Sequence, residues 1–152
     1  MKSMQEWFDE YAVSHQNKTN QSIHYICVPA IYFSIVGMLM SINTTFLVNT
    51  IGLNNSFIEN WGTVLLIFIL VFYLRLSVKI FLKMFVFSAL CVVGNYYISQ
   101  QFSLFYVSVG IFVVAWVGQF YGHHIEGEKP SFFKDLQFLL IGPPWVFEKL
   151  TR

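Results

Sequence analysis

The chain has 152 residues, of which 56% are hydrophobic, 19% aromatic and 11% charged, whereas soluble domains carry about 25% charged residues. Nine Lys and Arg against eight Asp and Glu give a net charge of +1, which argues against a soluble enzyme and against a nucleic-acid partner. A disordered chain and a disulfide-rich secreted module are excluded as well, which favours a single integral membrane domain over residues 1–152.

The first segment, residues 3–17, is predicted to form an amphipathic helix. Five of its side chains recur at steps of three and four and so share one face: Met4, Trp7, Phe8, Tyr11 and His15. The helix is expected to end in the polar stretch 16–22, where Asn20 is a candidate cap for the next helix. The segment has no apolar core and no small-residue cleavage site, so it does not resemble a secretory signal peptide.

Four apolar stretches follow, and a membrane-spanning helix needs about 17–25 such residues. The stretches are 26–42 or 26–48, then 61–76, 80–98 and 102–120. A bend is required near residues 77–79, because one helix over 61–98 would be about 57 Å long at 1.5 Å per residue. The expected fold is therefore all-α, an integral membrane four-helix bundle in a lipid bilayer.

Charge placement predicts how this bundle is oriented. With four crossings, all nine Lys and Arg residues lie on the side of both termini, which the positive-inside rule makes cytoplasmic. The last segment, 131–150, is too short in its apolar part to span and contains Gly142-Pro143-Pro144, which is expected to break it. We expect a re-entrant or interfacial segment there. A bacterial inner membrane is favoured, or the endoplasmic reticulum if the source is eukaryotic.

The four histidines all fall at the predicted cytoplasmic ends: His15, His24, His123 and His124. If the first and fourth spans pack together, the four histidines converge at one cytoplasmic opening of the bundle. Imidazole is the commonest protein metal ligand, and iron(II) favours two of them with a carboxylate. Glu126 would share a helical face with His123 if the fourth helix continues that far, and Asn20 would share one with His24 in the same way. Ordinary interfacial histidines are the alternative interpretation, and His124 is interpreted as a neighbour because adjacent helical side chains diverge.

Two blocks and the tail resemble the Mpo1-like family of small membrane proteins, over nearly the whole chain. The first block is His15-x4-Asn20-x3-His24-x4-Pro29. The second is Trp116-x2-Gln119-Phe120-x-Gly122-His123-x2-Glu126-x2-Lys129-Pro130. The tail is Pro143-x4-Glu148. Apart from the resemblance, a spacing of three residues indicates core packing for Trp116, Gln119 and Gly122. A glutamine in a membrane helix usually forms a hydrogen bond with a neighbouring helix.

The resemblance implies an iron(II)-dependent dioxygenase of the fatty acid α-oxidation type. Its substrates would be dioxygen and a 2-hydroxy fatty acid, which is shortened by one carbon with release of carbon dioxide. By motif matching, His15, His24 and His123 are the expected ligands of Fe²⁺, and Asn20 and Glu126 are the expected catalytic positions. The alternatives are a haem- or zinc-binding membrane protein and a non-catalytic four-helix membrane protein. The sequence does not indicate the oligomeric state.

Overall fold

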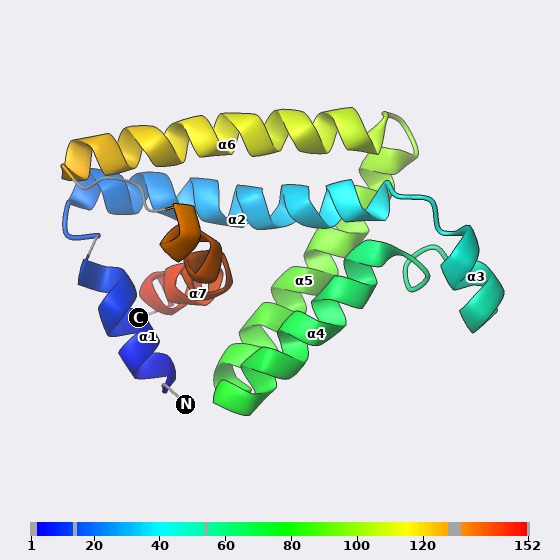
Figure 1. Cartoon of the computed structure of the whole chain (residues 1–152), viewed down its shortest axis with the longest axis horizontal. Coiled ribbons are helices and arrows are strands. Elements are labelled where there is room, and N and C mark those ends of the chain that lie inside the picture. The colour runs from blue at the N-terminus through cyan, green and yellow to red at the C-terminus, as the bar shows by residue number, and fades with distance from the viewer. Residues whose placement is uncertain (1–2, 14, 54, 128–131, 152) are drawn as a thin grey trace. The chain divides into compact units, whose positions relative to one another are not determined.

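The structure is a computed structural model that describes residues 3–13, 15–53, 55–127 and 132–151, with side chains in the last range from Leu139 onward. The described residues form seven helices and no strand, which confirms the all-helical prediction (Figure 1). The helices are α1 (Met4–Val13), α2 (Lys18–Met40), α3 (Thr45–Ile51), α4 (Trp61–Leu76), α5 (Val78–Ser99), α6 (Leu104–Glu126) and α7 (Phe132–Leu150). They form two compact units, residues 1–32 with 113–152, and residues 33–112.

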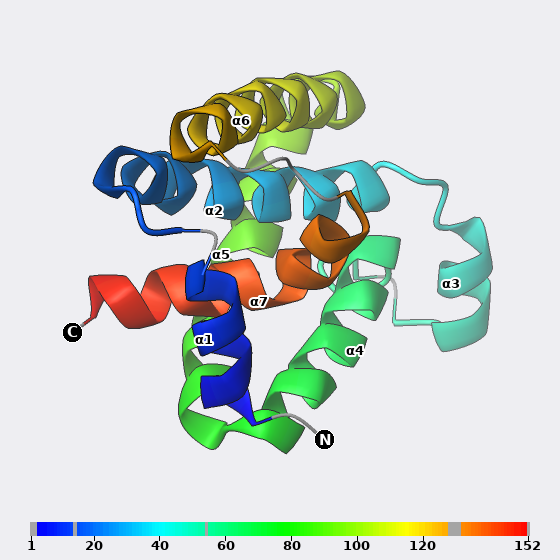
Figure 2. The ribbon, with the colours of Figure 1, turned by 60° about the vertical axis from the view of Figure 1, so that its left-hand side comes forward.

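The first unit contains α1, the start of α2, the end of α6, and α7. Helix α1 contacts α7 (Figure 2), and α2 packs closely on α6. Gly118 and Gly122, one helical turn apart, allow this approach. A Cβ atom at Gly118 would lie 2.6 Å from the Cys27 Sγ atom, and one at Gly122 would collide with the Asn20 side chain. Small residues at this spacing let two membrane helices come close together.

The junction between α1 and α2 differs from the prediction. Helix α1 ends at Val13, so His15 lies in the connection that follows and not on the helix. Helix α2 begins at Lys18, and its cap is Asn17, whose Oδ1 accepts hydrogen bonds from the Thr19 and Asn20 backbone N–H groups at 2.8 and 3.4 Å. The prediction that Asn20 caps α2 was wrong, because an Asn just before the first turn satisfies these amides first.

The second unit contains the hairpin of α4 and α5, which lie side by side (Figure 1). Ser77 joins them in an extended conformation, with φ −166° and ψ 125°, which confirms the predicted bend. Asn60 caps α4 by accepting a hydrogen bond from the Thr63 backbone N–H at 2.8 Å. The predicted second span, 61–76, therefore matches α4 at both ends.

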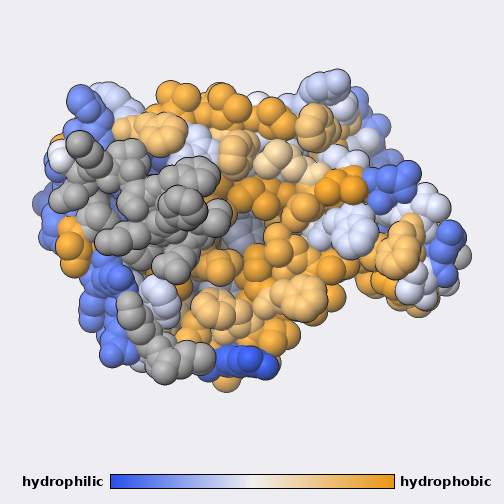
Figure 3. Space-filling model, viewed as in Figure 1, coloured by the Kyte–Doolittle hydropathy of each residue, from blue (hydrophilic) through white to orange (hydrophobic). Residues whose placement is uncertain are grey.

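Among the described residues, three helices are long and apolar enough to cross a membrane: α2, α5 and α6. Helix α4 is apolar but has only 16 residues. Large apolar side chains are exposed along α4, α5 and α6, and those of α4 and α6 are visible in Figure 3. This surface suits contact with lipid.

Two helices near the C-terminus differ from the prediction. Helix α6 continues past Phe120 to Glu126 and so carries His123. Helix α7 runs without interruption through Gly142, Pro143 and Pro144, so the prediction that this motif breaks the segment was wrong. Proline costs a helix one backbone hydrogen bond, and burial of the surrounding turn, including Ile141 and Trp145, compensates for that loss.

Candidate metal centre

Three histidines from distant parts of the chain meet in the first unit. His15 comes from the connection between α1 and α2, His24 from α2, and His123 from α6. Their ring centroids are 4.2 Å (His15–His24), 5.1 Å (His24–His123) and 5.5 Å (His15–His123) apart. Each ring offers a nitrogen within 4.8 Å of the other two, an arrangement that could hold a metal ion. The predicted convergence is confirmed for these three, whereas His124 is exposed and outside the cluster.

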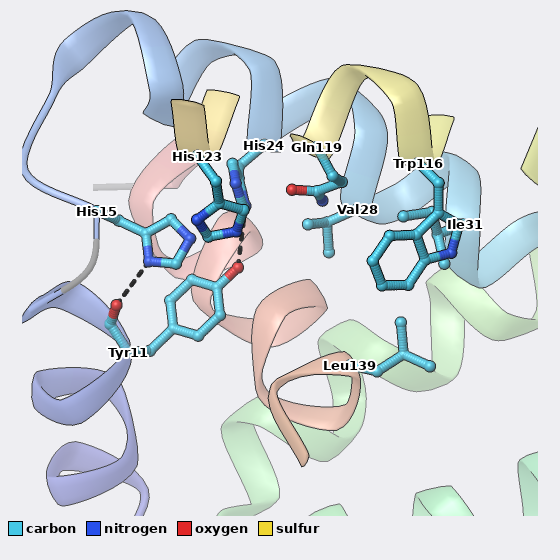
Figure 4. A pocket seen from close by; sticks show the side chains of 9 residues that line it. All are labelled: Tyr11, His15, His24, Val28, Ile31, Trp116, Gln119, His123 and Leu139. Carbon is cyan, nitrogen blue, oxygen red and sulfur yellow. Dashed lines mark hydrogen bonds between the residues drawn. The ribbon is translucent and has the colours of Figure 1, made fainter. Parts of the chain in front are cut away.

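Tyr11 orients two of the three rings (Figure 4). His15 Nδ1 donates a hydrogen bond to the Tyr11 carbonyl oxygen at 2.7 Å, which places the lone pair of that ring on Nε2. His24 Nδ1 is hydrogen-bonded to the Tyr11 hydroxyl at 3.1 Å. Metal-binding histidines are typically held in this way through the nitrogen that does not face the ion.

Two ring nitrogens of the histidine cluster are buried without a hydrogen bond. They are His24 Nε2 and His123 Nδ1, and neither has a partner among the residues the structure describes. Buried polar atoms are normally satisfied, so an unmade bond here requires an explanation. A metal ion between the rings would provide one.

The electrostatics of the cluster also suit a metal. Burial lowers the pKa of His15 to about 4, and the hydrogen bond to the Tyr11 carbonyl only partly offsets that effect. His15 is therefore neutral near pH 7, the form that binds metal ions. Neutral imidazole suits zinc, copper, iron and nickel alike, so the donor set fits a metal without selecting one.

The two predicted catalytic positions, Glu126 and Asn20, contact each other beside the cluster. The Glu126 carboxylate accepts hydrogen bonds from the backbone N–H groups of Gln16 at 2.8 Å and Asn17 at 3.0 Å. It also accepts one from Asn20 Nδ2 at 2.9 Å. These bonds tie the connection that carries His15 to the end of α6. The catalytic role of both residues stays a prediction, and the motif residues Lys129 and Pro130 lie outside the described residues.

A cavity of about 30 Å³ adjoins the histidines (Figure 4). Its lining residues are Tyr11, His15, His24, Val28, Ile31, Trp116, Gln119, His123 and Leu139. This volume is about that of one water molecule. It suits a small ligand beside the histidines, and a fatty acyl chain would have to push the apolar wall apart.

Sequence reasoning missed two aromatic residues of the site. Tyr11 was placed only on the apolar face that it shares with His15, yet its ring stacks on His15 at 4.1 Å between centroids. The ring of Trp145, from α7, lies 5.0 Å from Tyr11 and 5.7 Å from His15. The spacing of Tyr11 and His15, one helical turn, was an available signal for the first. No sequence feature pointed to Trp145.

Comparison with known proteins identifies one family. The whole chain, residues 1–152, matches the Mpo1-like family, described as 2-hydroxy-palmitic acid dioxygenase Mpo1-like. No match was found among the curated proteins, and none among the solved structures. The family match therefore includes every helix that contributes to the histidine cluster.

Proposed function

Because the chain belongs to the Mpo1-like family, we propose that it is an iron(II)-dependent dioxygenase of 2-hydroxy fatty acids. The observation that carries this proposal is the buried cluster of His15, His24 and His123. The family description supplies the substrate class, and imidazole ligands are compatible with iron. The product would be the fatty acid one carbon shorter, together with carbon dioxide.

The reaction needs no further reductant. A 2-hydroxy acid and dioxygen together contain the atoms of the shorter acid, carbon dioxide and water, and the hydroxy acid supplies the electrons. Iron(II), when bound, supplies the dioxygen chemistry that amino-acid side chains cannot perform. The carboxylate and hydroxyl of the substrate suit chelation at a metal that three protein ligands leave partly open.

The protein residues hold and enclose the site. The three histidines would be the ligands, and Tyr11 fixes the orientation of His15 and His24 through its carbonyl and hydroxyl groups. We assign Glu126 and Asn20 a positioning role, because their hydrogen bonds secure the connection that carries His15. Burial of the cluster excludes bulk water, which protects reactive oxygen chemistry from side reactions.

We propose the membrane arrangement on the same basis. Helices α2, α5 and α6 would each cross the bilayer, and the shorter α4 would be the fourth crossing. Segregation of the Lys and Arg residues supports cytoplasmic termini, in a bacterial inner membrane or the endoplasmic reticulum. Helix α7 would lie at the interface or re-enter the bilayer, and the lipid phase would deliver the substrate.

The alternative with specific support is a zinc protein. Three imidazoles with an open position are also a catalytic zinc set, and the cluster that holds them contains no carboxylate among the described residues. Zinc has no redox chemistry, so a zinc protein would leave 2-hydroxy acids unoxidised. The two functions therefore separate on metal content and product analysis.

The test uses the full chain in detergent, loaded anaerobically with iron(II). Wild-type protein should bind one iron per chain and convert 2-hydroxyhexadecanoic acid and dioxygen to pentadecanoic acid. His24→Ala and His123→Ala should lose both metal and activity. His124→Ala is the matched control and should retain both, since that ring is exposed. Full metal content in the His24 and His123 variants, or no shortened acid from wild type, would contradict the proposal.

A further inference from the structure

Gln119 is a buried amide that none of the roles above uses. It lies on α6, one helical turn before His123, and only 6% of its surface is exposed. Its Oε1 atom is fully buried and has no hydrogen-bond partner among the described residues. Glutamines in membrane helices usually bond a neighbouring helix. This one lines the cavity at the histidine cluster instead, so its unmet acceptor is available to a ligand there.

The cavity has two chemically different ends, and Gln119 lies where they meet (Figure 4). One end is formed by the three histidines. The other is apolar, with Val28, Ile31 and Leu139 in its wall. Figure 4 shows the Gln119 oxygen on the side of the histidines. A ligand with its head at the metal and its chain among the apolar residues would place the carbons nearest its head group beside this amide.

We propose that Gln119 recognises the 2-hydroxyl group of the substrate by accepting its hydrogen bond at Oε1. This inference rests on the proposed function, which supplies the substrate class. In an ionised 2-hydroxy acid the carboxylate can only accept hydrogen bonds, whereas the hydroxyl group is a donor. An unsubstituted fatty acid has no such donor and would leave Oε1 buried and unsatisfied.

Gln119 is therefore a specificity residue. A site built to hydrogen-bond a substrate hydroxyl discriminates strongly against the analogue that lacks it, because a buried polar group is then left unpaired. The selection of 2-hydroxy acids over ordinary fatty acids would depend on this one amide in addition to metal chelation.

The experiment measures binding without turnover, using the full chain loaded with cobalt(II) in detergent. Dissociation constants for 2-hydroxyhexadecanoate and hexadecanoate are determined by calorimetry for wild type and Gln119→Leu. The preference for the hydroxy acid should fall about 5- to 150-fold in the variant, as expected for one hydrogen bond to a buried group. Affinity for hexadecanoate should stay the same or increase, because the variant leaves no unpaired acceptor in the cavity. Tyr121→Phe, at an exposed position of α6, is the control and should keep the wild-type preference.

Two results would overturn the inference: an unchanged preference in Gln119→Leu, or an equal loss of affinity for both acids, which a merely structural role would produce. If Gln119→Leu does not load cobalt, Gln119→Met, close to glutamine in length, replaces it in the same measurement. The proposed function fails separately, if the wild-type protein neither prefers nor oxidises the hydroxy acid. If the wild-type protein prefers and oxidises the hydroxy acid, and the Gln119 variants show the same preference, only the role of Gln119 is refuted.

Discussion

Removal of the Glu126 carboxylate tests how the site is held together. This side chain accepts hydrogen bonds from the backbone of Gln16 and Asn17 and from the Asn20 amide, at 2.8 to 3.0 Å. In Glu126→Ala the three donors lose their shared acceptor, and the connection that carries His15 loses its tie to α6. His24 and His123 sit on helices and keep their positions.

The expected size of the effect follows from these bonds. A hydrogen bond to a charged group contributes about 1.5–3 kcal/mol, but Glu126 is only half-buried and Gln16 and Asn17 are exposed, so water replaces much of the loss. The net loss of metal-binding free energy is about 1–3 kcal/mol, which corresponds to about 5- to 150-fold weaker metal binding. That range agrees with the 10- to 100-fold typical of residues that support metal ligands.

The assay is a cobalt(II) titration followed by visible absorption. Glu126→Ala should need a higher cobalt concentration, yet at saturation its spectrum should match that of wild type, because the ligands are unchanged. Asp9→Asn, at an exposed carboxylate of α1, is the control and should titrate as wild type does. A changed spectrum at saturation would show that Glu126 is itself a ligand, and unchanged affinity would show that the tie is unnecessary. Either result refutes the reasoning.

Two further predictions concern Tyr11 and His15. Tyr11→Phe keeps the ring and the carbonyl bond to His15 but loses the hydroxyl bond to His24, so cobalt affinity should fall about 10-fold in the same titration; a loss of all binding would contradict this limited role. For the metal-free protein, the pKa of His15 is about 4 in the folded state and about 6.5 in the unfolded state. Between these pH values the unfolded state binds a proton that the folded state does not bind. The free energy of unfolding should therefore fall as the pH drops from 6.5 to 4. Thermal unfolding across this range checks it, and an equal slope in His15→Gln would exclude His15 as the cause.

The long apolar helices were predictable because long apolar runs have few structural options. The bounds of α4 followed from the run itself and from the need to turn near Ser77. The junction before α2 was less predictable, because Asn17 and Asn20 are both good caps and the choice depends on which backbone amides are left unpaired. His15 therefore appeared to extend the face of α1, although it lies beyond the end of that helix.

Within the site, local spacing pointed to residues that the fold brings together, but it did not indicate their partners. The separation of His123 and Glu126 by three positions indicated a shared helical face. This spacing could not show that His123 meets two other imidazoles, or that Glu126 accepts hydrogen bonds from Asn20 and two backbone amides. Trp145 was hidden for the same reason, since its contact with His15 depends on where α7 returns to α1. Contacts between distant segments are set by packing, which a single sequence does not display.

The hydrogen bond between Gln16 and Glu126 joins residues that are 110 positions apart, and this separation has a consequence for biosynthesis. The centre cannot exist while the ribosome is still making the early helices, because α6 emerges late. A metal ion held by the three histidines would therefore be acquired after most of the polypeptide has been made. Such an ion would close a very long loop and bind only the finished protein, so it would oppose unfolding. Metal supply would then limit how much mature protein persists in the cell.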